Sequence, residues 1–239
     1  FEGTSDYGEL VITDKSGNNK PFLFKMTGTS AVLSSRTFFV SQITISGSKT
    51  AKFCTIHDNH LVVSGDPSTP NTIYYSATND IDDFSGTGSG EITLEDKVVG
   101  LKSFRNELFI FCQNSIFKLI NINNSSTVAV VPVTKNVGCV DGQTIQEIAG
   151  DLVFLAPDGF RTVAGTARIG DVELGTISQA IQPIINKIVA ASNTLQFSSV
   201  VIRDKSQYRM FYSTSSDTSA TSKGIIGTLR PNGFEWSET

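Results

Sequence analysis

Short runs of apolar and β-branched residues, separated by polar turns, follow one another along almost the whole chain. Three of these runs share a finer pattern: an apolar residue, then a polar turn pair, then a run that starts with leucine. The turn pairs and leucines are Asp58-Asn59 with Leu61, Arg105-Asn106 with Leu108, and Gly150-Asp151 with Leu152. Because valine, isoleucine, threonine and phenylalanine favour extended backbone, the runs predict strands, and their recurrence predicts a repeated unit.

The spacing of the repeat predicts the fold class. The three leucines are about 47 and 44 residues apart, and a similar run from Tyr208 to Tyr212 begins about 56 residues after Leu152. A period of roughly 40–50 residues with several short strands is typical of β-propeller blades, because a small antiparallel sheet needs neighbours to cover both of its faces. We therefore expect an all-β, β-propeller-like repeat of about five small antiparallel sheets with one short inserted helix; a β-sandwich is the alternative.

The length of 239 residues fits a single β-propeller domain over residues 1–239. The chain opens in mid-pattern at Phe1 and closes in the strand-like segment GFEWSET. These ends lead us to expect a processed product or a fragment of a longer chain.

Several local elements can be placed. The strands Leu10–Thr13 and Phe22–Lys25 flank a turn at Lys15–Asn19, and Thr37–Ile45 forms a further strand. Asp158-Gly159 is the strongest hairpin-turn pair in the chain.

One segment breaks the strand pattern. In GTISQAIQPIINKIVA, helical spacing is shown by Ile177, Ile181, Ile185 and Ile188. Ser178 can cap this helix, and Pro183 should lie in its first turn or kink it.

Composition limits the classes of partner. Hydrophobic residues make up 39% of the chain, so a core can be buried, and the net charge of -4 gives no basic footprint for specific nucleic-acid binding. No apolar run approaches the ~20 residues of a membrane span. Cys54, Cys112 and Cys139 lack CxxC spacing and are expected to be small core residues.

Candidate metal and cofactor motifs are weak. His57 and His60 span a turn, without an evident third ligand. Asp80, Asp82 and Asp83 lie together but lack an EF-hand pattern, and the glycine-rich stretch at 86–90 lacks the strand and helix of a dinucleotide loop. We expect no metal site and no cofactor.

No catalytic set stands out. The chain has no GxSxG motif, and its two histidines leave few ways to form a catalytic triad. A glycosidase propeller would need separated inner-strand carboxylates, for which Asp151, Asp158 and Asp171 are candidates in principle. We expect a protein that is not an enzyme.

The stretch LAPDGFRTVAGTARIGDVELGTIS is the most distinctive in the chain. It predicts a hairpin, a glycine-rich loop that carries Arg161, Arg168 and Asp171, and then the helix. These charges either pair across the loop or form a contact surface for a neighbouring subunit. The three residues are our candidate protein-contact loop.

Four segments, in order, carry a family resemblance: TIYYSATNDIDDF, VVGLKSFRNELFIFCQNSIFKL, VGCVDGQTIQEIAGDLVFLAPDGFRTVAG and ELGTISQAIQPII. Over about residues 55 to 190 they resemble virion structural proteins of tailed bacteriophages, among them tail tubular (nozzle-type) and packaged-DNA stabilisation proteins. The resemblance implies a β-propeller that assembles with other copies or other virion proteins around the portal–tail axis. It supplies no catalytic residues to carry over.

The resulting expectation is a non-enzymatic structural component of the virion, in the tail or at the head–tail junction (the neck), multimeric in the particle. Its partners would be other virion proteins, and an acidic surface would keep DNA from sticking to a channel wall. The alternative is a host-adhesion or carbohydrate-binding propeller, which would need exposed aromatic residues in each blade; Trp236 is the single tryptophan.

Overall fold

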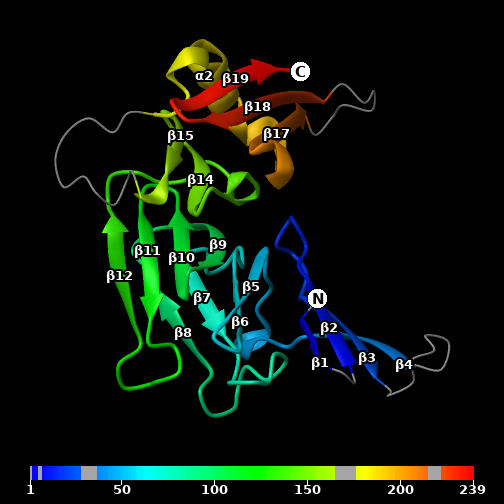
Figure 1. Ribbon diagram of the computed structural model, residues 1–239. Helices are drawn as coiled ribbons and strands as arrows, with labels where there is room; N and C mark the ends of the chain where they lie inside the picture. The colour runs from blue at the N-terminus through cyan, green and yellow to red at the C-terminus, as the bar shows by residue number, and fades with distance from the viewer. Residues whose placement is uncertain (1, 5–6, 28–36, 165–175, 215–221) are drawn as a thin grey trace. The chain divides into compact units, whose positions relative to one another are not determined.

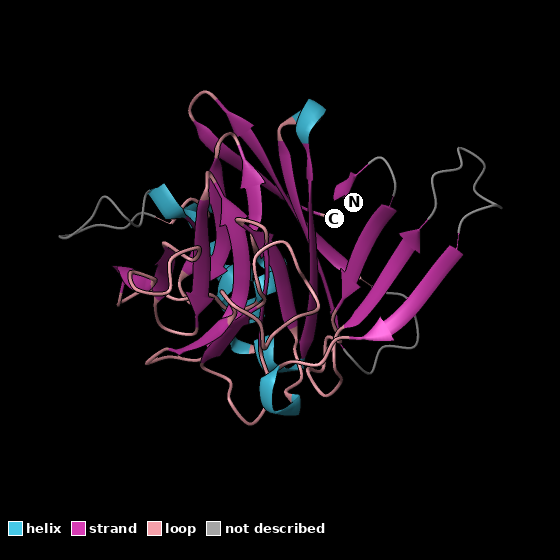
Figure 2. Ribbon diagram, turned by 90° about the horizontal axis from the view of Figure 1, so that it is seen from below, coloured by secondary structure: helices cyan, strands magenta, loops and turns pink. Residues whose placement is uncertain are grey.

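The structure, a computed structural model, describes residues 2–4, 7–27, 37–164, 176–214 and 222–239. Within these ranges the chain forms five small antiparallel sheets, each built from strands that are consecutive in the sequence (Figure 1). The separate meander sheets match the propeller-like repeat and not the two packed sheets of a β-sandwich. Figure 2 shows how strongly strands dominate over helices.

The five sheets follow one another along the chain. The first contains β1 (Glu2–Thr4), β2 (Tyr7–Ile12), β3 (Phe22–Thr27) and β4 (Thr37–Gln42). The second contains β5 (Phe53–His57), β6 (His60–Ser64), β7 (Thr72–Tyr75) and β8 (Gly90–Thr93). The third contains β9 (Val98–Phe104), β10 (Glu107–Cys112), β11 (Ile116–Ile120) and β12 (Ala129–Thr134). The fourth contains β13 (Gln146–Ile148), β14 (Asp151–Ala156) and β15 (Gly159–Thr162). The fifth contains β16 (Leu195–Ile202), β17 (Gln207–Thr214), β18 (Lys223–Arg230) and β19 (Gly233–Glu238).

The chain divides into two compact units. The first consists of Phe1–Leu108 with Leu119–Val130, and the second of Phe109–Lys118 with Val131–Thr239. The expectation of one domain over residues 1–239 stays a prediction.

The repeated sequence pattern is a repeated hairpin. Asp58 and Asn59 have φ angles of 45° and 65°, and Arg105 and Asn106 have φ angles of 51° and 60°. Two consecutive positive φ angles in a two-residue loop are the pattern of a type I′ turn, which matches the twist of the flanking strands. In the first of these hairpins the pair His57 and His60 closes the turn.

The third turn lies one residue earlier than predicted. Ala149 (φ 51°) and Gly150 (φ 76°) form it, and Ile148 pairs with Asp151, so Asp151 is already in β14. The sequence pointed to Gly150-Asp151 because those residues favour turns, whereas the strand register decides the position.

The turn fixes which side chain enters the core. Leu61, Leu108 and Leu152 are each the second residue of the strand that follows the turn, and all three are at most 1% exposed. Tyr208 occupies the same place in β17 and is fully buried, although a longer connection with Ser206 in the left-handed region (φ 50°) precedes it. Leu61, Leu108, Leu152 and Tyr208 therefore occupy equivalent positions in four of the sheets.

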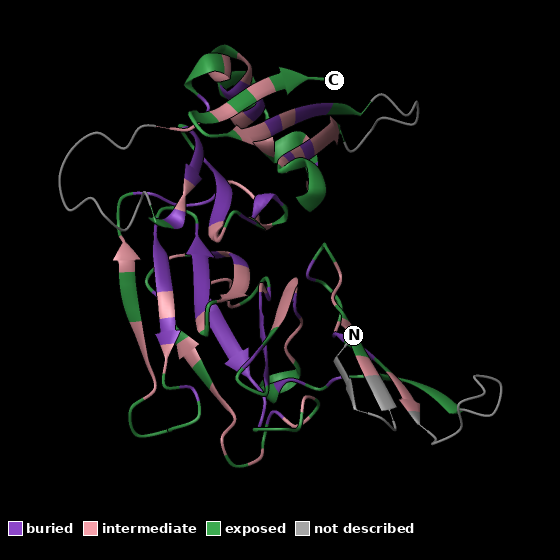
Figure 3. Ribbon diagram, viewed as in Figure 1, coloured by how far each residue is buried: buried purple, intermediate pink, exposed green. Residues whose placement is uncertain are grey.

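Each unit has its own core, shown by the buried colour of the inner strands in Figure 3. In the first unit Leu23, Ile43, Leu61 and Tyr74 pack together. In the second unit the core includes Phe160, Tyr208, Met210 and Ile225. Cys112 and Cys139 are buried as expected, Cys54 is half-buried, and none of them forms a disulfide.

The inserted helix α2 (Gln182–Ala190) follows a short 3₁₀ turn, η4 (Gln179–Ile181). Pro183 lies in its first turn, as predicted, and Ile185 and Ile188 are buried. Ser178 does not cap the helix; its hydroxyl oxygen accepts a hydrogen bond from the Phe160 N–H group at 3.0 Å.

Two other boundaries differ from the sequence prediction. β4 ends at Gln42 instead of Ile45, because the chain leaves the sheet there to bury Ile43 and Ile45 in the core. The tight turn before β15 consists of Pro157 and Asp158, because Gly159 already pairs with Ala156. None of the helices in the described ranges has the length and hydropathy needed to cross a bilayer.

The left-handed backbone at Ala149 predicts a stabilising substitution. Ala149→Gly should raise the free energy of unfolding by about 0.5–1 kcal/mol, because glycine adopts a positive φ angle without the steric cost of a Cβ atom. Urea denaturation of both proteins measures the change.

The matched control is Lys187→Gly inside α2, which should lower the free energy of unfolding by about 0.5–1 kcal/mol because glycine is a poor helix former. Equal effects at the two positions would contradict the turn geometry.

Candidate interaction surface

The register of the first sheet collects apolar side chains on one face. Leu10 of β2 pairs with Phe24 of β3, which pairs with Val40 of β4. Direct cross-strand partners point to the same side of a sheet, and residues two apart along a strand do so too. The residues on this side, which we call the apolar face, are Leu10, Ile12, Phe22, Phe24, Met26, Phe38 and Val40.

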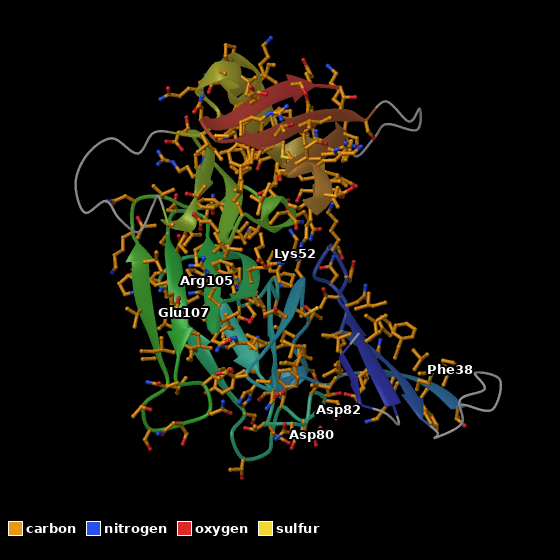
Figure 4. All side chains as sticks on the ribbon, in the orientation of Figure 1. Phe38, Lys52, Asp80, Asp82, Arg105 and Glu107 are labelled. Atoms are coloured by element: carbon orange, nitrogen blue, oxygen red, sulfur yellow. The ribbon has the colours of Figure 1, made fainter. Side chains whose placement is uncertain are left out.

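The apolar face is open to solvent. Leu10 and Phe24 are each 38% exposed, Val40 is 60% exposed and Phe38 is 62% exposed. Phe38 lies on β4, at the edge of the sheet (Figure 4). Single exposed apolar residues are normal, but a contiguous set on one sheet face marks an interaction surface.

The opposite face of the same sheet is the one that packs on the core of the first unit. Leu23 points to that side and is 2% exposed, within the core formed with Ile43, Ile45 and Ala51. The sheet therefore packs on its unit through the side that carries Leu23. The apolar face, on the other side, remains exposed.

The strand pattern alone did not reveal this surface. The segments ELVI, FLFKM and TFFV are apolar on both sides of the strand, which is typical of a sheet that is covered on both faces. The sequence does not show which of the two sheet faces packs against the rest of the unit, and that information is needed to detect the surface.

The candidate contact loop is only partly described. Arg161 lies in β15, is 6% exposed and forms an ion pair with Asp158, with a hydrogen bond from its Nε to Asp158 Oδ1 of 2.8 Å. Arg168 and Asp171 lie outside the described residues. The structure therefore shows Arg161 paired within its own hairpin, and the use of the loop as a contact stays a prediction.

Both histidines have structural partners. His57 Nδ1 lies 2.9 Å from the Ser103 hydroxyl, and His60 contacts the Ser76 carbonyl oxygen at 2.6 Å and Asn123 Oδ1 at 3.0 Å. These contacts hold β5, β6 and neighbouring segments of the first unit together. Within the described ranges no group of three or more His, Cys, Asp or Glu side chains is placed to hold a metal ion.

The acidic loop after β7 is organised by hydrogen bonds. Asp83 accepts hydrogen bonds from the N–H groups of Ser85 and Gly86 at 2.8 and 2.9 Å, which lower its pKa. A carboxyl–carboxyl hydrogen bond with Asp82 raises the pKa of Asp80, and the two residues lie in the same loop in Figure 4.

Two of the three carboxylates considered for glycosidase chemistry have structural partners. Asp151 Oδ1 accepts hydrogen bonds from the Leu152 and Ala164 N–H groups at 2.7 and 3.1 Å. Asp158 is paired with Arg161, and Asp171 lies outside the described residues.

A polar cavity of about 450 Å³ lies in the first unit, between the β5–β6 turn and the segment that follows β11. Its walls are mainly amide, carboxylate and imidazole side chains. They include His57, Asp58, Asn106, Glu107, Asn121 and Asn123. No aromatic ring of the described residues other than the imidazole of His57 lines the cavity.

Trp236 is engaged in packing. Its ring stacks on Phe160 at 4.8 Å between centroids, and its indole N–H donates to the Ile177 carbonyl oxygen at 2.6 Å. The tryptophan therefore holds β19 to β15 and to the segment before α2 and is not an open platform for a ligand.

Comparisons with known proteins return solved structures of low similarity. No protein-family model and no curated protein matches the chain. The chain is similar to the solved N-terminal domain of Nup159, with 13% identity, a TM-score of 0.48 and coverage of 100% of this chain and 69% of that one. It is also similar to Saccharomyces cerevisiae Sqt1 (9% identity, TM-score 0.46, 99% of this chain and 66% of that one). A third similar structure is Kluyveromyces lactis Hsv2 (12% identity, TM-score 0.43, 98% and 82%).

These three proteins are β-propellers. At identities of 9–13% and TM-scores of 0.43–0.48 these likenesses support no conclusion of their own about this chain.

The buried histidine at the cavity predicts a pH-dependent stability. Burial lowers the pKa of His57, and the Asp58 carboxylate 3.9 Å from Nε2 only partly opposes this effect. The unfolded chain, with a histidine pKa of ~6.5, then binds more protons than the folded chain, so stability should decrease as the pH falls from about 6.5.

His57→Gln should make this decrease shallower and should cost about 1 kcal/mol at neutral pH through the lost hydrogen bond to Ser103. Urea denaturation at several pH values measures both effects. An identical pH slope in the variant would show that His57 does not contribute.

Proposed function

We propose that the chain is a non-enzymatic structural protein that assembles through protein–protein contacts, and that the assembly is a tailed-bacteriophage virion. The observation that carries the assembly role is the apolar face, because an uncharged, contiguous and exposed sheet face has the composition of an interface core. The placement in the virion, at the tail or the head–tail junction, rests on the resemblance of residues 55–190 to virion proteins of that kind.

The polar groups support a structural role as well. The imidazoles of His57 and His60 and the carboxylates of Asp151 and Asp158 are engaged in hydrogen bonds or ion pairs that hold loops and strands together. Residues used in this way stabilise a rigid scaffold, which is the physical requirement for a protein that must present surfaces to its neighbours.

The proposal predicts the composition of particles. Virions should be purified from a phage whose genome encodes this chain. Quantitative mass spectrometry of these particles should find the chain at a fixed stoichiometry to the other virion proteins. Cryo-electron microscopy of the same particles should place it in a symmetric ring or lattice at the tail or neck. A chain that is absent from purified particles and stays free in the lysate would refute the proposal.

The polar cavity favours a second candidate, a carbohydrate-binding adhesin. Asparagine and carboxylate side chains are suitable hydrogen-bond partners for sugar hydroxyl groups, and the 450 Å³ volume is within the range of ligand sites. The missing aromatic platform and the packed Trp236 make this candidate weaker.

The adhesin candidate predicts binding on a glycan array that weakens at least about tenfold in Asn121→Gly, which removes one amide from the cavity wall and suits the φ angle of 57° at this position. The control is Asn186→Ala on α2, far along the chain and in the second unit. If the chain binds no glycan on the array, the adhesin candidate is refuted and the structural role is the remaining proposal.

A further inference from the structure

The apolar face is large enough to be the centre of a stable interface. Its side chains other than Met26 are between 36% and 62% exposed. With aromatic side chains of ~150–250 Å² each, they together expose on the order of 500 Å² of apolar surface, at the upper end of what a monomer usually leaves open. A standard interface buries ~800 Å² per partner, so this face would supply most of one side.

The chemistry of the face favours a second copy of the same chain. Apart from Gln42, the described side chains on this side of β2, β3 and β4 are apolar, and none is charged. An uncharged apolar surface is complementary to itself under a two-fold axis, whereas it offers no charge that would select a different partner. Two chains of net charge -4 repel one another, so an uncharged face is also where they can approach most closely.

The obvious head-to-tail alternative fits less well. On the solvent side of the fifth sheet, Val200 pairs directly with Arg209, which pairs with Ile226. The Arg209 guanidinium donates to Gln207 Oε1 at 2.7 Å and would be covered by phenylalanine rings if this sheet packed on the apolar face of another copy. Burying a guanidinium against an apolar surface is costly unless a carboxylate accompanies it.

From these observations we propose that two copies of the chain pack face to face through the apolar face, so that their first sheets form a two-layered β-sandwich across a two-fold axis. Two sheets packed in this way lie ~10 Å apart with interdigitated side chains. Phe24 and Val40 lie in the middle of the face and would be at the centre of the interface, with Phe38 and Ile12 nearer its ends. The inference rests on the proposed role in assembly and names the partner of that surface.

Neighbouring phenylalanines in β4 provide a matched test. Phe38 and Phe39 are 62% and 54% exposed, but Phe38 belongs to the apolar face and Phe39 points to the other side with its partner Lys25. The wild-type chain should sediment at twice 25.7 kDa at micromolar concentrations. Phe38→Gln should raise the dimer Kd at least about 100-fold, because each dimer loses two buried rings, whereas Phe39→Gln should change it less than about threefold.

Two further variants make the outcome decisive. Val40→Lys should abolish the dimer, and circular dichroism should show that the variant is folded, because Val40 is 60% exposed in the single chain. Val200→Lys on the fifth sheet should leave the dimer intact.

Three results would overturn the inference. The first is a wild-type chain that remains monomeric at high micromolar concentration, and the second is an equal effect of the substitutions at Phe38 and Phe39. The third is a dimer that is broken by Val200→Lys and not by Val40→Lys. Virions that contain a chain which is monomeric in isolation would refute the dimer alone. A dimer sensitive to Phe38→Gln that is absent from virions would refute the proposed function alone.

Discussion

A small antiparallel sheet has two faces, and the free energy of this fold depends on covering them. Leu61, Leu108, Leu152 and Tyr208 show how the chain meets that constraint, because each is the second residue of its strand and each is buried. The turn sets the strand register, and a shift of one residue would turn the buried side chain toward solvent. The two-residue hairpin is used before β6, β10 and β14, and a longer connection reaches the same position in β17.

The same constraint explains the surface of the first sheet. Leu23 on one side is buried in the core of its unit, while Phe24 on the other side remains exposed. Fully burying an exposed phenylalanine contributes ~1.5–3 kcal/mol, and Phe24, at 38% exposure, would contribute the corresponding part of that to association. The assembly that we propose would cover this face and so extend burial to the side of the sheet that is exposed in the single chain.

The polar residues show a complementary division. The imidazole of His60 joins Ser76 and Asn123, and the carboxylate of Asp158 joins Arg161, so groups that could serve chemistry are used to fix loops. Buried polar groups of this kind need partners, and the partners found here lie on neighbouring strands and turns. The polar cavity beside His57 is one place in the described part of the chain where such groups surround open space.

The sequence by itself determined the strand-rich class, the period of the repeat and the short helix, because these follow from local propensity and from the spacing of apolar residues. It also located Leu61, Leu108 and Leu152 as equivalent positions, since a repeated hairpin leaves a repeated pattern. The exact third turn at Ala149 and the role of Ser178 were decided by tertiary structure, because strand register and a long-range hydrogen bond outweigh local turn and cap preferences. The apolar face was likewise decided there, since the sequence shows which residues are hydrophobic, whereas only the packed structure shows which of their two sheet faces has no cover within the chain.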